Sequence, residues 1–85
     1  MRLTADQLAD FDDKGYIFLP GCFSEEQVAL MRDEGEAILK SYRQEVWREK
    51  TGAPRTAFAA HTFNEVFRIL GAHPRLVEPL QQYFG

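Results

Sequence analysis

The chain is poor in the features that mark several common classes of protein. It has a single cysteine, Cys22, so an internal disulfide is excluded, and this fits a reducing cytoplasm. No run approaches the roughly 20 apolar residues that cross a bilayer. Residues 1–6 also lack the apolar stretch of a signal peptide. We therefore expect a soluble, cytoplasmic protein that does not bind membranes.

The chain also has little excess of charge of either sign. The net charge is -3 at pH 7, which offers no basic surface for nucleic acid. Hydrophobic residues make up 45% and charged residues 27%, a composition typical of a globular chain and too apolar for a disordered one. Eighty-five residues are enough for one small domain, 1–85, with a thin core unless something else completes it.

The sequence contains no pattern of a self-contained active site. Its glycines are scattered singly, so no phosphate-binding loop is present. Cys22 has no neighbouring histidine or cationic cluster, which favours a small buried side chain over a nucleophile. A facial iron site needs two imidazoles and a carboxylate, yet neither His61 nor His73 is followed two residues later by an acid. We assign no catalytic residue and no metal ligand, and we interpret His73 as a capping or surface residue.

One acidic stretch resembles the first half of a calcium loop. Asp10, Asp12 and Gly15 have the required spacing, but the fifth position is Lys14 and the twelfth is Gly21. A bidentate glutamate is needed at the twelfth position, so we reject a calcium site. The same residues indicate the end of a helix followed by a strand.

The order of local signals predicts an α+β chain of about four helices and one or two short strands. Capping-box patterns begin three helices, at Thr4, Ser24 and Thr62, and Pro74 suits the first turn of a fourth. The first helix should end at Gly15 and the second in the low 40s, and Gly85 would cap the last. The second helix should have one apolar face, made of Val28, Met31, Ile38, Tyr42 and Val46.

The strand signals are fewer. Residues 16–19 form an aromatic and β-branched run closed by a Pro-Gly turn, which favours a strand. Residues 45–54 predict a loop, and residues 55–61 an extended segment. Two isolated strands do not make a stable sheet, so the apolar helix faces must pack on one another or on something outside the chain.

Residues 55–61 also contain the candidate binding residues. Arg55 on an extended segment can clamp a carboxylate with two parallel hydrogen bonds. His61 lies six residues further on, an even offset that places it on the same side of a strand. The alternative is a surface arginine and a half-buried histidine in a connecting segment, which the residues alone favour.

Two stretches of the chain resemble a known family. The first is Leu3-Thr4-Ala5-Asp6-Gln7-Leu8, Phe11, Lys14-Gly15-Tyr16-Ile17-Phe18-Leu19-Pro20-Gly21 and Phe23-Ser24-Glu25-Glu26-Gln27-Val28. It resembles the opening of phytanoyl-CoA dioxygenase-type enzymes. The second is Glu49-Lys50, Gly52, Arg55-Thr56, Phe58 and His61, then Phe67-Arg68, Leu70, His73-Pro74-Arg75-Leu76-Val77 and Phe84-Gly85. It is similar to the bacterial ectoine and proline hydroxylases of that superfamily.

The resemblance implies the N-terminal, mostly helical portion of a double-stranded β-helix (jelly-roll) enzyme whose core strands are missing here. Such enzymes use Fe(II) and 2-oxoglutarate to hydroxylate small molecules, with a His-x-Asp motif, a distal histidine and an arginine that come later in the family's chain. None of these has a counterpart in this sequence. The resemblance places Arg55, Phe58 and His61 near the cavity mouth, as candidates for a substrate-side wall.

Two hypotheses follow. In the first, the chain is part of a dioxygenase acting on an amino acid or an ectoine-like compound and is inactive alone. In the second, it is a small non-enzymatic helical module that binds a partner, or itself, through exposed apolar helix faces.

Overall fold

The computed structural model describes residues 2–85, which form two compact units. The first combines residues 2–22 with 72–85, and the second comprises residues 23–71. The described residues form an α+β structure, as expected. Its elements are α1 (Ala5–Lys14), α2 (Glu25–Lys40), β1 (Val46–Arg48), β2 (Pro54–Ala57), the 3-10 turn η1 (Ala60–Thr62), α3 (Glu65–Gly71) and α4 (Pro74–Phe84).

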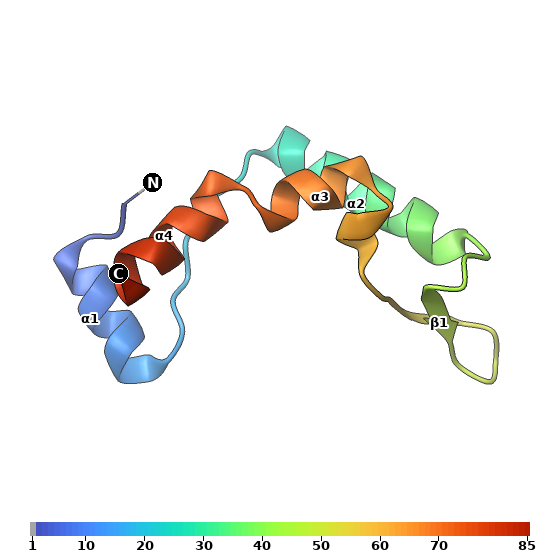
Figure 1. Ribbon diagram of the computed structural model, residues 1–85, viewed down its shortest axis with the longest axis horizontal. Helices are drawn as coiled ribbons and strands as arrows, with labels where there is room; N and C mark the ends of the chain where they lie inside the picture. The colour runs from blue at the N-terminus through green and yellow to red at the C-terminus, as the bar shows by residue number, and fades with distance from the viewer. Residues whose placement is uncertain (1) are drawn as a thin grey trace. The chain divides into compact units, whose positions relative to one another are not determined.

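In the first unit, α1 and α4 lie side by side (Figure 1). The Phe11 and Tyr83 rings meet edge to face, with 4.7 Å between ring centroids. Gln82 ties the N-terminal segment to α4, because its side chain accepts from the Leu3 N–H at 2.7 Å and donates to the Leu3 carbonyl at 2.9 Å. These contacts bury Leu3, which is 7% exposed.

The caps of these two helices confirm the sequence predictions. Thr4 and Gln7 form the full capping box, and α1 ends at Gly15 with a left-handed φ of 80°. His73 caps α4 by accepting the Arg75 N–H on its side chain, and Pro74 occupies the first turn. Gly85 closes α4 by donating its N–H to the Gln81 carbonyl.

The strand predicted at residues 16–19 is wrong. The segment runs as a loop from α1 to a turn closed by the Cys22 N–H on the Leu19 carbonyl, at 3.2 Å. Tyr16 and Phe18 still share one side, with their rings edge to face at 6.0 Å. A strand needs a neighbour for its backbone groups, and across residues 2–85 the sheet pairs only β1 with β2.

In the second unit, α2 begins at the predicted cap, Ser24, but ends at Lys40. The Ser41 hydroxyl donates to the Ile38 carbonyl at 2.6 Å, and the backbone of Ser41 is extended. Tyr42 and Val46 therefore lie beyond the helix, not on its apolar face as predicted. Ile38, in the last turn, is buried.

The two strands form an antiparallel hairpin within this unit. The register pairs Val46 with Ala57, Trp47 with Thr56 and Arg48 with Pro54, so the ladder has a bulge on the β2 side. The loop predicted for residues 45–54 is thus wrong for 46–48 and for Pro54, which begins β2. The extended segment predicted for residues 55–61 ends at Ala57, because Ala59 adopts a left-handed φ of 55° and leads into η1.

Helix α3 starts two residues later than the predicted capping box at Thr62 implies. Asn64, not Thr62, caps α3 by accepting the Phe67 N–H at 3.1 Å. The Thr62 hydroxyl instead donates to the Ala59 carbonyl, at 2.7 Å. Asn64 also donates to Glu34 at 2.9 Å and so links α3 to α2. A Cβ added at Gly35 would lie 3.7 Å from the Phe67 ring, so the two helices approach closely there.

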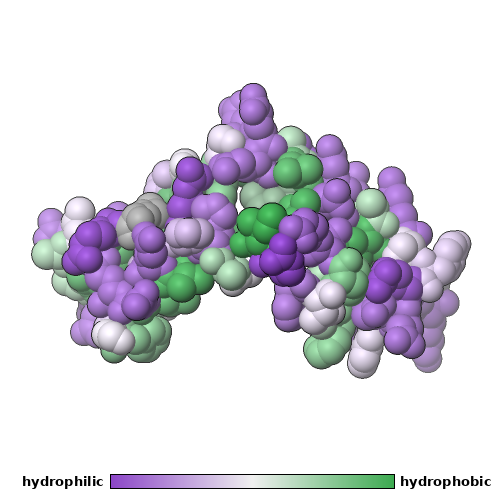
Figure 2. All heavy atoms as spheres, turned by 45° about the horizontal axis from the view of Figure 1, so that its top comes forward, coloured by the Kyte–Doolittle hydropathy of each residue, from purple (hydrophilic) through white to green (hydrophobic). Residues whose placement is uncertain are grey.

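The core is thin. Among residues 2–85 the buried hydrophobic side chains are Leu3, Ile38 and Val46. Many large apolar side chains are exposed, and green areas in Figure 2 show hydrophobic residues reaching the surface. The exposed set is Tyr16, Phe18, Val28, Leu30, Tyr42, Trp47, Phe58, Ile69, Leu76, Val77, Leu80 and Phe84. Among the helices of the described chain, none combines the length and apolar character needed to cross a membrane.

Candidate functional site

The β1–β2 hairpin positions two of the three candidate residues, and its two faces differ in character. The inner face carries Val46, which is 8% exposed, and Arg48. The outer face carries the paired Trp47 and Thr56, because successive strand residues point to opposite sides. Phe58 lies two residues beyond Thr56, and its N–H continues the ladder by donating to the Glu45 carbonyl at 2.8 Å. Phe58 therefore shares the outer face with Trp47.

Arg48 anchors the hairpin to the end of α2. Its guanidinium donates to the carbonyls of Leu39 at 2.9 Å and Ser41 at 2.8 Å, and to the Gly52 carbonyl at 2.9 Å. The first two bonds satisfy carbonyls at the C-terminal end of α2, where no further helical turn donates an N–H to them. The third fixes the loop between the strands. Arg48 therefore fixes the position of β1, the strand that also carries Trp47 on the outer face.

The candidate Arg55 occupies the bulge, between the residues that pair with Trp47 and Arg48. Its Nε lies 3.8 Å from Glu49 Oε1, and the two side chains are 66% and 58% exposed. Such an exposed, long ion pair contributes little stability. The guanidinium is therefore accessible for another anion.

The structure does not place His61 on the same strand side as Arg55. The argument from an even offset is wrong because the strand ends at Ala57 and the chain turns at Ala59. His61 is exposed in η1, and its Cβ lies 4.0 Å from a Cβ built at Gly71. Within residues 2–85, no hydrogen bond or ion pair links Arg55, Phe58 and His61 to one another.

Trp47 is the outer-face residue that sequence reasoning missed. It is 60% exposed and Phe58 is 69% exposed, so the face presents two large aromatic rings to solvent. The signal that could have found it is alternation: Val46-Trp47-Arg48 faces in, out and in again. The stretch is too short for periodicity alone to distinguish it from a loop.

The described residues do not fit an iron site. No group of three or more histidine, cysteine, aspartate or glutamate side chains within residues 2–85 is arranged to hold a metal ion. The imidazole Nδ1 of His73 accepts the Arg75 N–H at 3.1 Å, so it serves the α4 cap. The acidic stretch considered for calcium is an ordinary helix end, in which Lys14 pairs with Asp10 at 2.9 Å.

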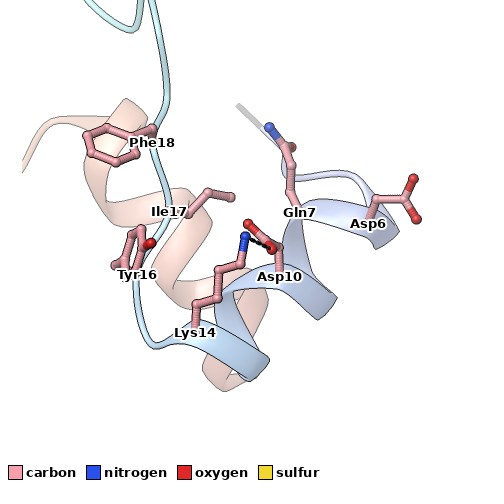
Figure 3. Close-up of a pocket in the computed structure, with 7 residues that line it drawn as sticks. All are labelled: Asp6, Gln7, Asp10, Lys14, Tyr16, Ile17 and Phe18. Carbon is pink, nitrogen blue, oxygen red and sulfur yellow. Dashed lines mark ion pairs between the residues drawn. The ribbon is translucent and has the colours of Figure 1, made fainter.

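The first unit has an open hollow of about 510 Å³ (Figure 3). Its walls come from α1 and from the loop that follows it, and they comprise Asp6, Gln7, Asp10, Lys14, Tyr16, Ile17 and Phe18. The Lys14–Asp10 ion pair crosses one side of it. Both charges are thus already satisfied within the chain, and none of the three candidate residues belongs to this hollow.

Among residues 2–85, three ionisable groups have shifted pKa values, and they belong to α3 and α4, not to the hairpin. A hydrogen bond from Arg68 lowers the pKa of Glu65, and the same contact raises the pKa of Arg68. The Tyr83 hydroxyl donates to Asp12 at 2.7 Å, which raises the pKa of Tyr83. These shifts report local surface contacts rather than an acid–base site.

The fold and the hairpin together define a small α+β chain with an exposed arginine, two exposed aromatic rings and, among its described residues, no group of side chains arranged to hold a metal ion. No family model matches it. It is similar to proteins named ectoine dioxygenase: 30% identical over 88 residues to those of Bordetella parapertussis and Bordetella bronchiseptica, covering 98% of this chain. The identity to the ectoine dioxygenase of Stutzerimonas stutzeri is 31% over 78 residues, covering 86% of this chain.

The similarity runs along nearly all of this chain but only part of each relative. The chain spans 29% of the length of the two Bordetella proteins and 26% of the Stutzerimonas protein. The comparisons therefore support an origin in a dioxygenase family, as the sequence resemblance implies. Most of each relative has no counterpart in these 85 residues.

Proposed function

We propose that this chain is the N-terminal part of a non-haem Fe(II)- and 2-oxoglutarate-dependent dioxygenase of the phytanoyl-CoA dioxygenase superfamily. The complete enzyme hydroxylates a small molecule, either an amino acid or an ectoine-like compound. The observation that carries the proposal is the 30% identity to ectoine dioxygenases along 98% of the chain. We also propose a cytoplasmic location, in keeping with the unpaired Cys22.

Iron and 2-oxoglutarate would bind to the part of the enzyme that this chain does not match. The described residues offer no group suited to the metal. The chain itself would supply a substrate-side wall from Arg55, Phe58 and His61. Its exposed apolar side chains would pack on the jelly-roll strands, which explains why so few are buried here. Covering the wall with the remaining strands would exclude water from the substrate.

A turnover assay tests whether this chain lacks the ligands for iron and 2-oxoglutarate. The purified 85-residue chain is incubated with Fe(II), 2-oxoglutarate and either ectoine or proline, and succinate is measured. We expect no succinate above a control without protein, because the metal ligands are supplied elsewhere. Succinate formation that depends on the added iron would contradict the assignment.

The second candidate function is a non-enzymatic interaction module. The observation that favours it is the apolar stripe of α4, in which Leu76, Val77, Leu80 and Phe84 are exposed. These residues recur at helical spacing on one side of α4, next to Tyr83, whose ring contacts both Phe84 and Phe11 of α1. Sedimentation and thermal melting separate the two functions. A sharp cooperative melt of a monomer supports an independent module, and a broad melt with self-association supports a part of a larger core.

A further inference from the structure

The loop that follows α1, residues 16–19, has the burial pattern of a strand with one face covered. Tyr16 and Phe18 are 57% and 81% exposed, whereas Ile17 and Leu19 are half-buried. This alternation is the period of an extended chain, and all four residues have negative φ. Figure 3 shows the Ile17 side chain pointing toward α1 and the Tyr16 and Phe18 rings on the other side of the backbone. One face of the segment is therefore turned toward the chain's own helix, and the face with the two rings is open.

Local structure fixes both ends of this segment. Gly15 before it and Gly21 after it have left-handed φ values of 80° and 68°, which glycine adopts without strain. The turn at its end is closed by the Cys22 N–H, which donates to the Leu19 carbonyl at 3.2 Å. The segment thus keeps its extended course without a strand beside it.

The backbone groups between these ends are unpaired within the described chain. No hydrogen bond joins the N–H or C=O groups of Tyr16, Ile17 and Phe18 to any other group of residues 2–85. Successive residues of a strand direct these groups to opposite edges, so Tyr16 and Phe18 share one edge and Ile17 and Leu19 share the other. The second edge is partly closed, because the Leu19 carbonyl already accepts from Cys22. The edge of Tyr16 and Phe18 therefore offers two N–H and two C=O groups to an added strand.

The hollow of about 510 Å³ beside α1 gives such a strand room for its side chains. Side chains that it places next to Ile17, on the α1 face, would enter this hollow, which Tyr16, Ile17 and Phe18 help to line. The ion pair of Asp10 and Lys14 at 2.9 Å already satisfies two of the charges there. On the opposite face, the side chains would meet the Tyr16 and Phe18 rings, which lie edge to face with centroids 6.0 Å apart. Both faces favour an apolar strand.

We propose that the edge of Tyr16 and Phe18 pairs with an apolar strand from the part of the dioxygenase that this chain does not match. This inference rests on the proposed function and goes beyond it, because it assigns main-chain pairing to named residues. The chain spans 29% of the length of its Bordetella relatives, so most of such an enzyme is available to supply the strand from the same polypeptide. Residues 16–19 then belong to a larger sheet, with α1 on one of its faces.

Amide hydrogen exchange, read at single residues, tests the pairing. The complete protein is a chimaera in which the segment of the Bordetella bronchiseptica ectoine dioxygenase that aligns with this chain is replaced by the corresponding residues of this chain. In the isolated 85-residue chain, the amides of Tyr16 and Phe18 should exchange as in an unstructured peptide, because neither has a partner. In the chimaera, both should exchange about 100-fold more slowly, as in a paired strand.

Two proline variants make the test specific. Phe18→Pro removes one N–H of the open edge, and it should accelerate exchange at Tyr16 in the chimaera about tenfold while leaving the melting of the isolated chain unchanged. The matched control is Lys50→Pro. Lys50 is the first central residue of the turn that the Gly52 N–H closes on the Glu49 carbonyl at 2.9 Å, a position that suits proline. This variant should leave the Tyr16 amide unchanged.

Fast exchange at both amides in a folded chimaera would overturn the proposal and leave the dioxygenase origin intact. Slow exchange in a folded chimaera that forms no succinate would support the pairing and count against the proposed function. Protection that appears in the isolated chain as its concentration rises would also overturn the proposal, since the strand would come from a second copy. If the chimaera is insoluble, the amides aligned with Tyr16 and Phe18 are measured in the unmodified Bordetella enzyme, and the same criteria decide.

Discussion

Replacing Arg48 by methionine should release the hairpin from α2. The substitution keeps an unbranched apolar side chain but removes three hydrogen bonds, to the carbonyls of Leu39, Ser41 and Gly52. A hydrogen bond to a charged group contributes about 1.5–3 kcal/mol to stability. The Gly52 bond is exposed and the other two are only partly buried, so water replaces part of the loss. We expect the hairpin to lose about 2 kcal/mol in total.

Amide hydrogen exchange measures that loss locally. The N–H groups of Phe58 and Glu49 close the hairpin ladder, onto the carbonyls of Glu45 and Ala53. A loss of about 2 kcal/mol corresponds to roughly 30-fold faster exchange at these two amides. Arg32→Met, on the exposed side of α2, is the matched control and should leave both rates unchanged. Acceleration of less than threefold in Arg48→Met would refute the view that Arg48 positions the candidate face.

Three further outcomes follow from other contacts. Ser24→Ala removes the capping box of α2 and should lower its stability by about 1 kcal/mol, seen as reduced helical circular dichroism. In the folded chain the pKa of Tyr83 is raised above its ordinary 10.0. The hydrogen bond from Tyr83 to Asp12 therefore adds to the free energy of unfolding below pH 10, and this stabilisation is lost as the pH rises through the raised pKa. Denaturant midpoints should therefore fall at alkaline pH in the native chain and change less in Tyr83→Phe. Leu80→Gln should leave the melting of the isolated chain almost unchanged, because Leu80 is already exposed, whereas a large loss would show that the α4 stripe is covered.

Helix ends were predictable because their determinants are local. Thr4 and Ser24 find their partners three residues away, and His73 is fixed as a cap by the proline that follows it. Thr62 carries the same pattern yet fails, because Asn64 is a stronger competitor that also reaches Glu34, thirty residues earlier in the chain. A contact between residues so far apart in the sequence cannot be predicted from a local sequence pattern.

Strands were predicted poorly because their partners are not local. Residues 16–19 have the composition of a strand, but no neighbouring strand pairs with them among the described residues. Val46–Arg48 has little strand signal and forms one because β2 returns alongside it. Of the candidate residues, Arg55 and Phe58 were named from their order along the chain, and their place in a substrate-side wall stays a prediction. The exposed position of Trp47 was missed because it depends on the strand register, and His61 was misplaced because one left-handed residue ends the strand.

A chimaera tests the dioxygenase origin most directly. In the Stutzerimonas stutzeri ectoine dioxygenase, the segment that aligns with this chain is replaced by the corresponding residues of this chain. A second chimaera carries the same residues in scrambled order. The measurement is succinate formed from 2-oxoglutarate in the presence of ectoine. We predict a soluble, folded chimaera with turnover well above the scrambled control. A chimaera that is as insoluble and inactive as the scrambled control would contradict the account.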